Sequence, residues 1–221
     1  MQEKFFKDEE KVKSFIATMG KARIARYLND SNGTNEGAMQ LYHWNSLTSQ
    51  ALYFPLQVWE VCLRNRINKF LIKKYNAKWP YDQRALRNLK KEDFRRLRQV
   101  KARQERERNA HQAPTDSIVA DLSAGFWVSQ LSKAYEVPYT WHYNLQRVFP
   151  YEQKMGRQEA HDICDKLLIL RNRVAHHEPI YSLDLKTRRQ ELERMIKAMC
   201  PGSQAYLHWG CTFETVLQQR P

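Results

Sequence analysis

The residues best suited to chemistry lie in one stretch, 170–179, where an apolar run passes directly into arginine, asparagine, histidine and glutamate. Histidine titrates closest to neutral pH and can give or take a proton there. Arginine carries a permanent planar charge that matches phosphate oxygens and stabilises charge developing in a transition state. Since RNA carries its own nucleophile, the 2′-hydroxyl, Arg171 and His176 are candidates for cleaving it without a metal. Asn172 can donate and accept, so it could hold a reacting group or the histidine.

The spacing of these residues imposes a geometric constraint. Asn172 and His176 stand four apart, so they would share one face of a helix. Arg171 stands five before His176, which is about 140° round the helix axis. One helix therefore does not bring Arg171 and His176 fully together, and a second element or a second copy of the same helix would complete a pocket. A purely structural role stays open, in which both residues decorate a helix C-terminus, where the helix dipole favours cations.

A metal site is not expected in this stretch. His176, His177 and Glu178 are adjacent, and adjacent residues point in different directions on a helix. No second cluster of ligand types is present, and the sequence lacks the patterns HExxH, GxxxxGK[ST] and GxSxG. We therefore expect no metal and no cofactor.

The composition bounds the class of protein. Hydrophobic residues make up 42% of the 221 residues, enough for a sizeable core, and no run of 18 apolar residues could span a membrane. The first ten residues are too charged for a secretion signal. Four scattered cysteines form no CxxC pair, which is typical of reduced thiols in the cytosol: Cys62, Cys164, Cys200 and Cys211. We expect a single cytoplasmic domain over residues 1–221.

The charge balance favours a polyanionic partner. The formal net charge is +13, which makes nucleic acid the first partner to consider. Residues 84–108 hold 11 Lys or Arg and 4 Asp or Glu, a local excess of 11 − 4 = +7. This stretch is either a solvated helical arm or a track for a phosphate backbone, and both can hold at once. The candidate RNA-binding residues are Lys90, Lys91, Arg95, Arg96, Arg98, Lys101 and Arg103.

The apolar residues recur at helical spacing, and no alternating strand pattern is present. Helices are predicted over 9–28, 39–75, 118–131, 158–176 and 187–199. Pro55 could begin a second helix or kink a continuous one. Pro179 is expected to stop the fourth of these helices, and Pro201 with Gly202 the fifth. The predicted fold class is all-α, an antiparallel helical bundle with a basic helical extension near 84–108.

Glu60 and Arg64 lie within the predicted helix 39–75, one turn apart, with Asn65 beside them. Residues at this spacing can pair on one helix face. From periodicity alone an ordinary surface pair, worth a few tenths of a kcal/mol, is the favoured interpretation.

The pattern Arg171-Asn172-x-x-x-His176 resembles the R-x4-H signature of the HEPN superfamily of ribonucleases and RNA-binding proteins. Residues 170–180 as a whole are similar to the Abi-like branch, the bacterial abortive-infection proteins. Further segments resemble the same branch in the same order: 41–45, 58–65 and 121–131. The resemblance covers residues from about 20 to about 210.

The resemblance implies a HEPN helical bundle with metal-independent endoribonuclease activity that leaves a 2′,3′-cyclic phosphate and a 5′-hydroxyl. Arg171 and His176 would be the catalytic pair and Asn172 a supporting polar residue. Such proteins usually form their active site at a homodimer interface. The implied role is a toxin-like effector of anti-phage defence, related to the HEPN nuclease domains of type VI CRISPR effectors.

The resemblance also bears on partners and supporting residues. Some relatives act with a structured noncoding RNA that guides or restrains them, and the basic stretch could hold one. Supporting positions around the catalytic pair would be Glu60, Arg64, Asn65, His177 and Glu178. Toxins paired with a nucleotidyltransferase antitoxin often carry tyrosine two residues after the histidine. Glu178 stands there instead, which puts that form of regulation in doubt.

Two other functions compete with an endoribonuclease. A non-catalytic RNA-binding module would grip RNA at the same site without cutting it. A DNA-binding regulator would show no preference for RNA, and the sequence contains no recognition-helix pattern for it.

Overall fold

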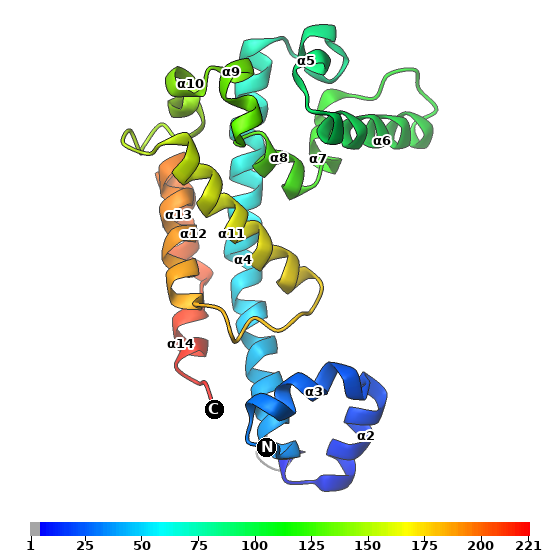
Figure 1. The fold of residues 1–221 in the computed structure, drawn as a ribbon, viewed down its shortest axis with the longest axis vertical. Helices are drawn as coiled ribbons and strands as arrows, with labels where there is room; N and C mark the ends of the chain where they lie inside the picture. The colour runs from blue at the N-terminus through cyan, green and yellow to red at the C-terminus, as the bar shows by residue number, and fades with distance from the viewer. Residues whose placement is uncertain (1–4) are drawn as a thin grey trace. The chain divides into compact units, whose positions relative to one another are not determined.

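The computed structural model describes residues 5–221. Every regular element among them is helical and none is a strand, which confirms the all-α prediction (Figure 1). The charged N-terminal segment predicted not to be a secretion signal begins with residues 1–4, which lie outside the described residues.

The helices group into two compact units. Unit 1 comprises the chain up to Phe54 together with Arg173–Asp184 and Gly210–Pro221, and unit 2 comprises Pro55–Asn172 and Leu185–Trp209. Because each unit is assembled from separate stretches, the chain is not divisible into two consecutive domains. A single domain over 1–221 stays a prediction.

Unit 1 is built around the first half of the long helix α4. Its helices are α2 (Glu9–Met19), α3 (Lys21–Asp30), the part of α4 (Asn35–Lys74) up to Phe54, and α14 (Phe213–Leu217). The single helix predicted over 9–28 is wrong, because the chain breaks at Gly20. That residue has φ of +91°, a conformation that glycine adopts without the steric cost of a side chain.

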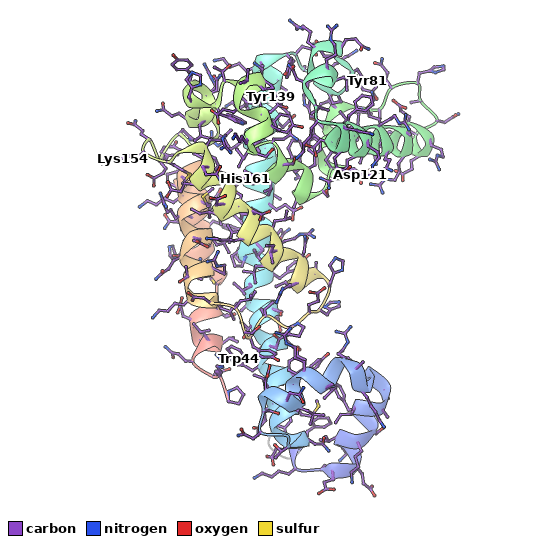
Figure 2. The ribbon with its side chains drawn as sticks, in the orientation of Figure 1. Trp44, Tyr81, Asp121, Tyr139, Lys154 and His161 are labelled. Carbon is purple, nitrogen blue, oxygen red and sulfur yellow. The ribbon has the colours of Figure 1, made fainter. Side chains whose placement is uncertain are left out.

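The core of unit 1 joins α3, α4 and the segment that follows α11. Tyr27 of α3 is buried, and its ring lies 5.2 Å from that of Tyr42 on α4 and 5.1 Å from that of Tyr181, centroid to centroid. Aromatic pairs at this separation gain energy beyond their buried area. Trp44 of α4 donates from Nε1 to the carbonyl oxygen of Val216 at 2.8 Å, which ties α14 to the same core (Figure 2).

Unit 2 contains the second half of α4 and most of the remaining helices. They are η1 (Trp79–Tyr81), α5 (Gln83–Asn88), α6 (Lys91–Glu107), α7 (Thr115–Asp121), α8 (Ala124–Ser129), η2 (Lys133–Tyr135), α9 (Glu136–Tyr139), α10 (Trp141–Val148), α11 (Arg157–Ala175) up to Asn172, α12 (Leu185–Met199) and α13 (Pro201–Gly210). Figure 1 shows α6 packed beside α7. Aromatic residues of several of these short helices are fully buried, among them Trp79, Trp127 and Trp141.

Several predicted helix boundaries need correction in unit 2. The helix predicted over 118–131 is two short helices, α7 and α8. Pro201 does not simply end a helix, since it is the first residue of α13. Proline suits this first position, where its missing N–H would have no partner in any case. Of the two possibilities for Pro55, the structure has a continuous helix, because α4 runs through it.

Candidate functional site at the end of α11

The helix α11 ends in a Schellman motif. The N–H of Glu178 donates to the carbonyl oxygen of Arg173 at 2.8 Å, and the N–H of His177 donates to that of Val174 at 3.2 Å. His177 has φ of +56°, the left-handed conformation that this motif requires at the residue after the cap. The helix therefore ends before Pro179 is reached, and the prediction that Pro179 stops it is wrong.

A left-handed histidine is unusual. Glycine normally occupies this position, and a residue with a side chain costs roughly 1–2 kcal/mol there. His176 precedes it as the first residue beyond α11 and is exposed, as are His177 and Glu178. The expected sharing of a helix face therefore does not extend to His176, which lies outside the helix. Among the described residues, neither histidine nor Glu178 has an ion-pair partner.

The backbone that follows α11 is anchored firmly within unit 1. Arg173 donates from its guanidinium to the carbonyl oxygen of Pro179 at 3.2 Å, and Arg23 of α3 donates to that of His177 at 2.9 Å. Tyr181 donates its hydroxyl to Asp30 at 2.5 Å. These contacts hold the backbone of the histidine segment in place while its exposed side chains stay available.

Asn45 of α4 makes the most enclosed of these anchors. Its side-chain Oδ1 accepts hydrogen bonds from the N–H groups of Ile180 at 2.8 Å and Tyr181 at 3.2 Å. Only 5% of Asn45 is exposed. The sequence comparison with the Abi-like branch included Asn45 but gave it no role. The sequence offered no clear signal for it, because Ser46, Thr48 and Ser49 near it on α4 are polar as well.

A cavity of about 360 Å³ opens in unit 1 beside this anchor. Val174 and His177 line one side of it. The other side is one face of α4, formed by Tyr42, Asn45, Ser46, Ser49, Gln50 and Tyr53. These positions follow the i, i+3, i+4, i+7 spacing of a single helix face, so a polar and aromatic stripe of α4 forms the wall. The cavity has the size of small ligand sites, which begin at about 300 Å³.

In unit 2, the partner of Arg171 is Glu60. The guanidinium Nε of Arg171 donates to Glu60 Oε2 at 2.9 Å, which joins α11 to α4 across 111 positions of sequence. The expected pair between Glu60 and Arg64 is wrong. Arg64 instead donates to the carbonyl oxygen of Ala120 at 3.4 Å.

The remaining atoms of this group are less constrained. The Nη1 atom of Arg171 lies 3.5 Å from Asn172 Oδ1. The Nη2 atom of Arg171 has no partner among residues 5–221. The side chain of Arg171 is 37% exposed and that of Glu60 is 21% exposed. Asn65 is exposed on α4. Glu60 thus fixes the direction of the Arg171 guanidinium while leaving part of it accessible to an anion.

Most of the basic residues on and beside α6 are engaged within unit 2. Arg103 forms a two-pronged ion pair with Asp121 of α7. Figure 2 labels Asp121 beside α6. Lys101 donates to the carbonyl oxygen of Pro80 at 3.1 Å and lies 4.0 Å from the centre of the Tyr81 ring. Burial lowers the pKa of Lys101, because it disfavours the charged form.

A buried carboxylate holds the start of α6. Asp93 is fully buried and accepts hydrogen bonds from the hydroxyls of Ser129 at 2.6 Å and Tyr135 at 2.7 Å. Lys90 and Arg96 lie 3.9 and 3.4 Å from its oxygens. Burial and the neighbouring Asp93 carboxylate raise the pKa of Tyr135 well above its usual value. This cluster serves the fold, so two of the predicted RNA-binding residues are structural ion-pair partners.

The remaining predicted cations of α6 differ in their freedom. Arg95 is paired with Glu92 at 2.6 Å. Lys91 and Arg98 are exposed, and neither has an acidic partner in the part of the chain that the structure describes. Of the seven predicted RNA-binding residues, these two are therefore the cations most accessible to a phosphate.

Other kinds of site find no support in residues 5–221. No group of three or more potential ligands that could hold a metal ion is present there, and all four cysteines are free. None of the described helices combines the length and apolar character needed to cross a membrane.

Comparisons of the chain with protein-family models, curated proteins and solved structures found no match.

Proposed function

We propose that this chain is a metal-independent endoribonuclease of the Abi-like HEPN type, a toxin-like effector of bacterial anti-phage defence that acts in the cytoplasm. The observation that carries the proposal is the ion pair between Glu60 and Arg171. It links two sequence segments that independently resemble the same branch, and it directs an arginine that the R-x4-H signature assigns to catalysis.

In the proposed reaction, the 2′-oxygen of RNA forms a bond to phosphorus while the bond to the 5′-oxygen breaks. The products are a 2′,3′-cyclic phosphate and a 5′-hydroxyl. The 2′-hydroxyl loses one proton and the 5′-oxygen gains one, and His176 takes or gives a proton in this exchange. The guanidinium of Arg171 stabilises the negative charge on the phosphorane oxygens. Exposed Lys91 and Arg98 contact the RNA backbone.

The partners in this proposal are RNA and a second copy of the chain. Within one chain Arg171 belongs to α11 and His176 lies beyond its end. In this proposal each active site takes Arg171 from one protomer and His176 from the other, the arrangement that the resemblance implies. A structured noncoding RNA that guides or restrains the enzyme is a further partner, bound by Lys91 and Arg98 of α6.

The test is cleavage of unstructured single-stranded RNA in EDTA. The His176→Ala protein should lose about 100-fold or more in rate, the usual contribution of a positioned acid or base. Glu60→Gln should lower kcat by about tenfold with little change in KM, because Arg171 loses its orienting charge. Glu214→Gln, at an exposed glutamate of α14, is the matched control and should cleave at the wild-type rate.

A mixing experiment tests the shared site. Arg171→Ala and His176→Ala proteins should each be inactive alone. Mixed and allowed to exchange subunits, they should recover about one quarter of the wild-type activity, because half of the dimers then hold one complete site. No recovery in a verified mixed dimer would overturn the shared arrangement.

A non-catalytic RNA-binding protein is the second candidate. The observation that favours it is the same contact, because Arg171 is already engaged by Glu60 and is not wholly free for a transition state. Wild-type and His176→Ala proteins that bind RNA equally and cleave none would select this function over the nuclease.

A further inference from the structure

The cavity in unit 1 has no part in the chemistry proposed above. None of its lining residues is Asp, Glu, Lys or Arg. A phosphate would therefore meet no compensating charge inside it. Two tyrosines and a histidine contribute flat rings to the lining instead, and Tyr53 is 63% exposed. Flat rings without charge suit an uncharged aromatic ligand that stacks.

The polar groups of the wall are arranged by internal hydrogen bonds. The side-chain oxygen Oδ1 of Asn45 accepts hydrogen bonds from two backbone N–H groups, which uses both of its lone pairs. The amide nitrogen Nδ2 is therefore the atom of Asn45 left for a ligand. Ser46 and Ser49 donate their hydroxyl protons to carbonyl oxygens of α4 at 3.0 and 2.8 Å. With their protons used in this way, the two serine oxygens can meet a ligand only as acceptors. The wall offers one buried donor beside two acceptors, the complement of a nucleobase edge.

His177 supplies an independent observation. The Schellman motif requires a left-handed residue at this position and favours glycine, so the histidine side chain adds a strain that the helix end itself does not need. His177 is also one of the two residues outside α4 that line the cavity. Backbone strain of this kind clusters at active sites and ligand-binding positions.

We infer that this cavity binds one unpaired base of single-stranded RNA, stacked on Tyr53 and His177 and bonded at its edge by Asn45 and the serines. The inference rests on the proposed function, because it names the part of the substrate that the cavity recognises. Sequence-specific recognition of RNA commonly uses unstacked bases held in this way, on aromatic rings and by edge hydrogen bonds.

The test measures binding without cleavage. Two fluorescein-labelled pentamers are compared by anisotropy at one salt concentration: a 2′-O-methyl RNA, which lacks the attacking hydroxyl, and an all-abasic backbone of the same length and charge. The wild-type protein should bind the RNA about tenfold more tightly than the abasic backbone, in line with the contribution of one stacked base. Equal binding of the two would overturn the inference.

Two variants separate the cavity from the fold. Tyr53→Ala should lose about tenfold in affinity for the RNA and none for the abasic backbone. His177→Gly should lose affinity in the same way while unfolding at an equal or higher temperature, because glycine relieves the strain. Tyr143→Ala removes a tyrosine that is 76% exposed in unit 2 and is the control, expected to bind as wild type. Unchanged RNA binding by both cavity variants would overturn the inference.

The outcome is distinct from that of the cleavage experiment. A wild-type protein that cleaves RNA, while the cavity variants bind and cleave normally, keeps the nuclease and overturns the base site. A protein that cleaves no RNA, but whose base-dependent binding is lost in Tyr53→Ala, keeps the base site and overturns the nuclease.

Discussion

The helix α6 and the segment 176–178 both present polar and charged side chains, but they use them in opposite ways. On and beside α6 the charge is dense, yet five of the seven predicted RNA-binding cations are tied to carboxylates, a carbonyl oxygen or a ring. In the segment 176–178 the charge is sparse. There the backbone is held by hydrogen bonds, and the side chains have no ion-pair partner among the described residues.

The difference shows that charge density is a poor guide to a binding surface. A cation already paired with a carboxylate must lose that partner before it meets a phosphate, so its contribution to RNA binding is reduced. A backbone that is already fixed spares a ligand the cost of ordering the chain, so that only the side chains remain to be ordered. The predictions below test how far the charged side chains of α6 serve the fold and how far they are free for a ligand.

The largest expected effect concerns the fold at α6. Asp93→Ala should destabilise the protein by roughly 3–5 kcal/mol, because it strands two buried hydroxyl donors and removes the charge facing Lys90 and Arg96. Urea unfolding followed by circular dichroism measures this. Glu92→Ala, one residue away and exposed, should cost less than about 1 kcal/mol. Similar costs for the two variants would show that Asp93 does not anchor the helix.

An intermediate effect concerns the free cations of α6. Lys91→Ala combined with Arg98→Ala should weaken binding of single-stranded RNA and lower the slope of log affinity against log salt by about 1.4, or about 0.7 for each lost phosphate contact. Arg103→Ala should leave that slope unchanged, because its charge is held by Asp121. A larger change of this slope in Arg103→Ala than in the double variant would show that the paired cation, not the two free ones, contacts the RNA.

The smallest effect is a pH dependence at the far end of α6. Burial and a hydrogen bond to Glu105 raise the pKa of Tyr81 to about 12. In the unfolded chain the pKa of the same phenol is near 10.0. The neutral phenol therefore stabilises the folded state fully below that pH, and this stabilisation is lost as the pH rises to about 12. Urea midpoints across this window should fall less steeply in Tyr81→Phe. An identical pH dependence in the two proteins would exclude Tyr81 as the cause.

Periodicity was sufficient for the fold class and for the long helices, because apolar residues at helical spacing must be buried together. It failed at helix ends set by a left-handed residue. Gly20 divides a predicted helix, and His177 ends α11 although its type carries no stop signal. Local patterns also could not find the contact of Arg171 with Glu60, since nothing in either segment specifies a partner 111 residues away.

The candidate site shows the same limit. Chemical type and spacing selected Arg171 and His176. The cavity beside His177, however, depends on which face of α4 lies against the segment that follows α11. Asn45 belongs to the segment 41–45 that resembles the Abi-like branch, but α4 carries many polar residues, and nothing in the sequence distinguishes Asn45 among them. Its role as a backbone anchor depends on hydrogen bonds to Ile180 and Tyr181, and only tertiary structure supplies these.

The interleaving of the two units has a consequence for synthesis on the ribosome. Unit 1 draws on three stretches of chain, and the last of them, 210–221, supplies the fully buried Phe213 and the carbonyl partner of Trp44. Domains generally fold as units while the chain is being made. Unit 1 cannot follow that course until its last stretch has emerged, so a nascent chain that already carries His176 and His177 still lacks the finished surroundings of both. For the nuclease proposed above, this order of synthesis would delay activity until residues 210–221 have emerged.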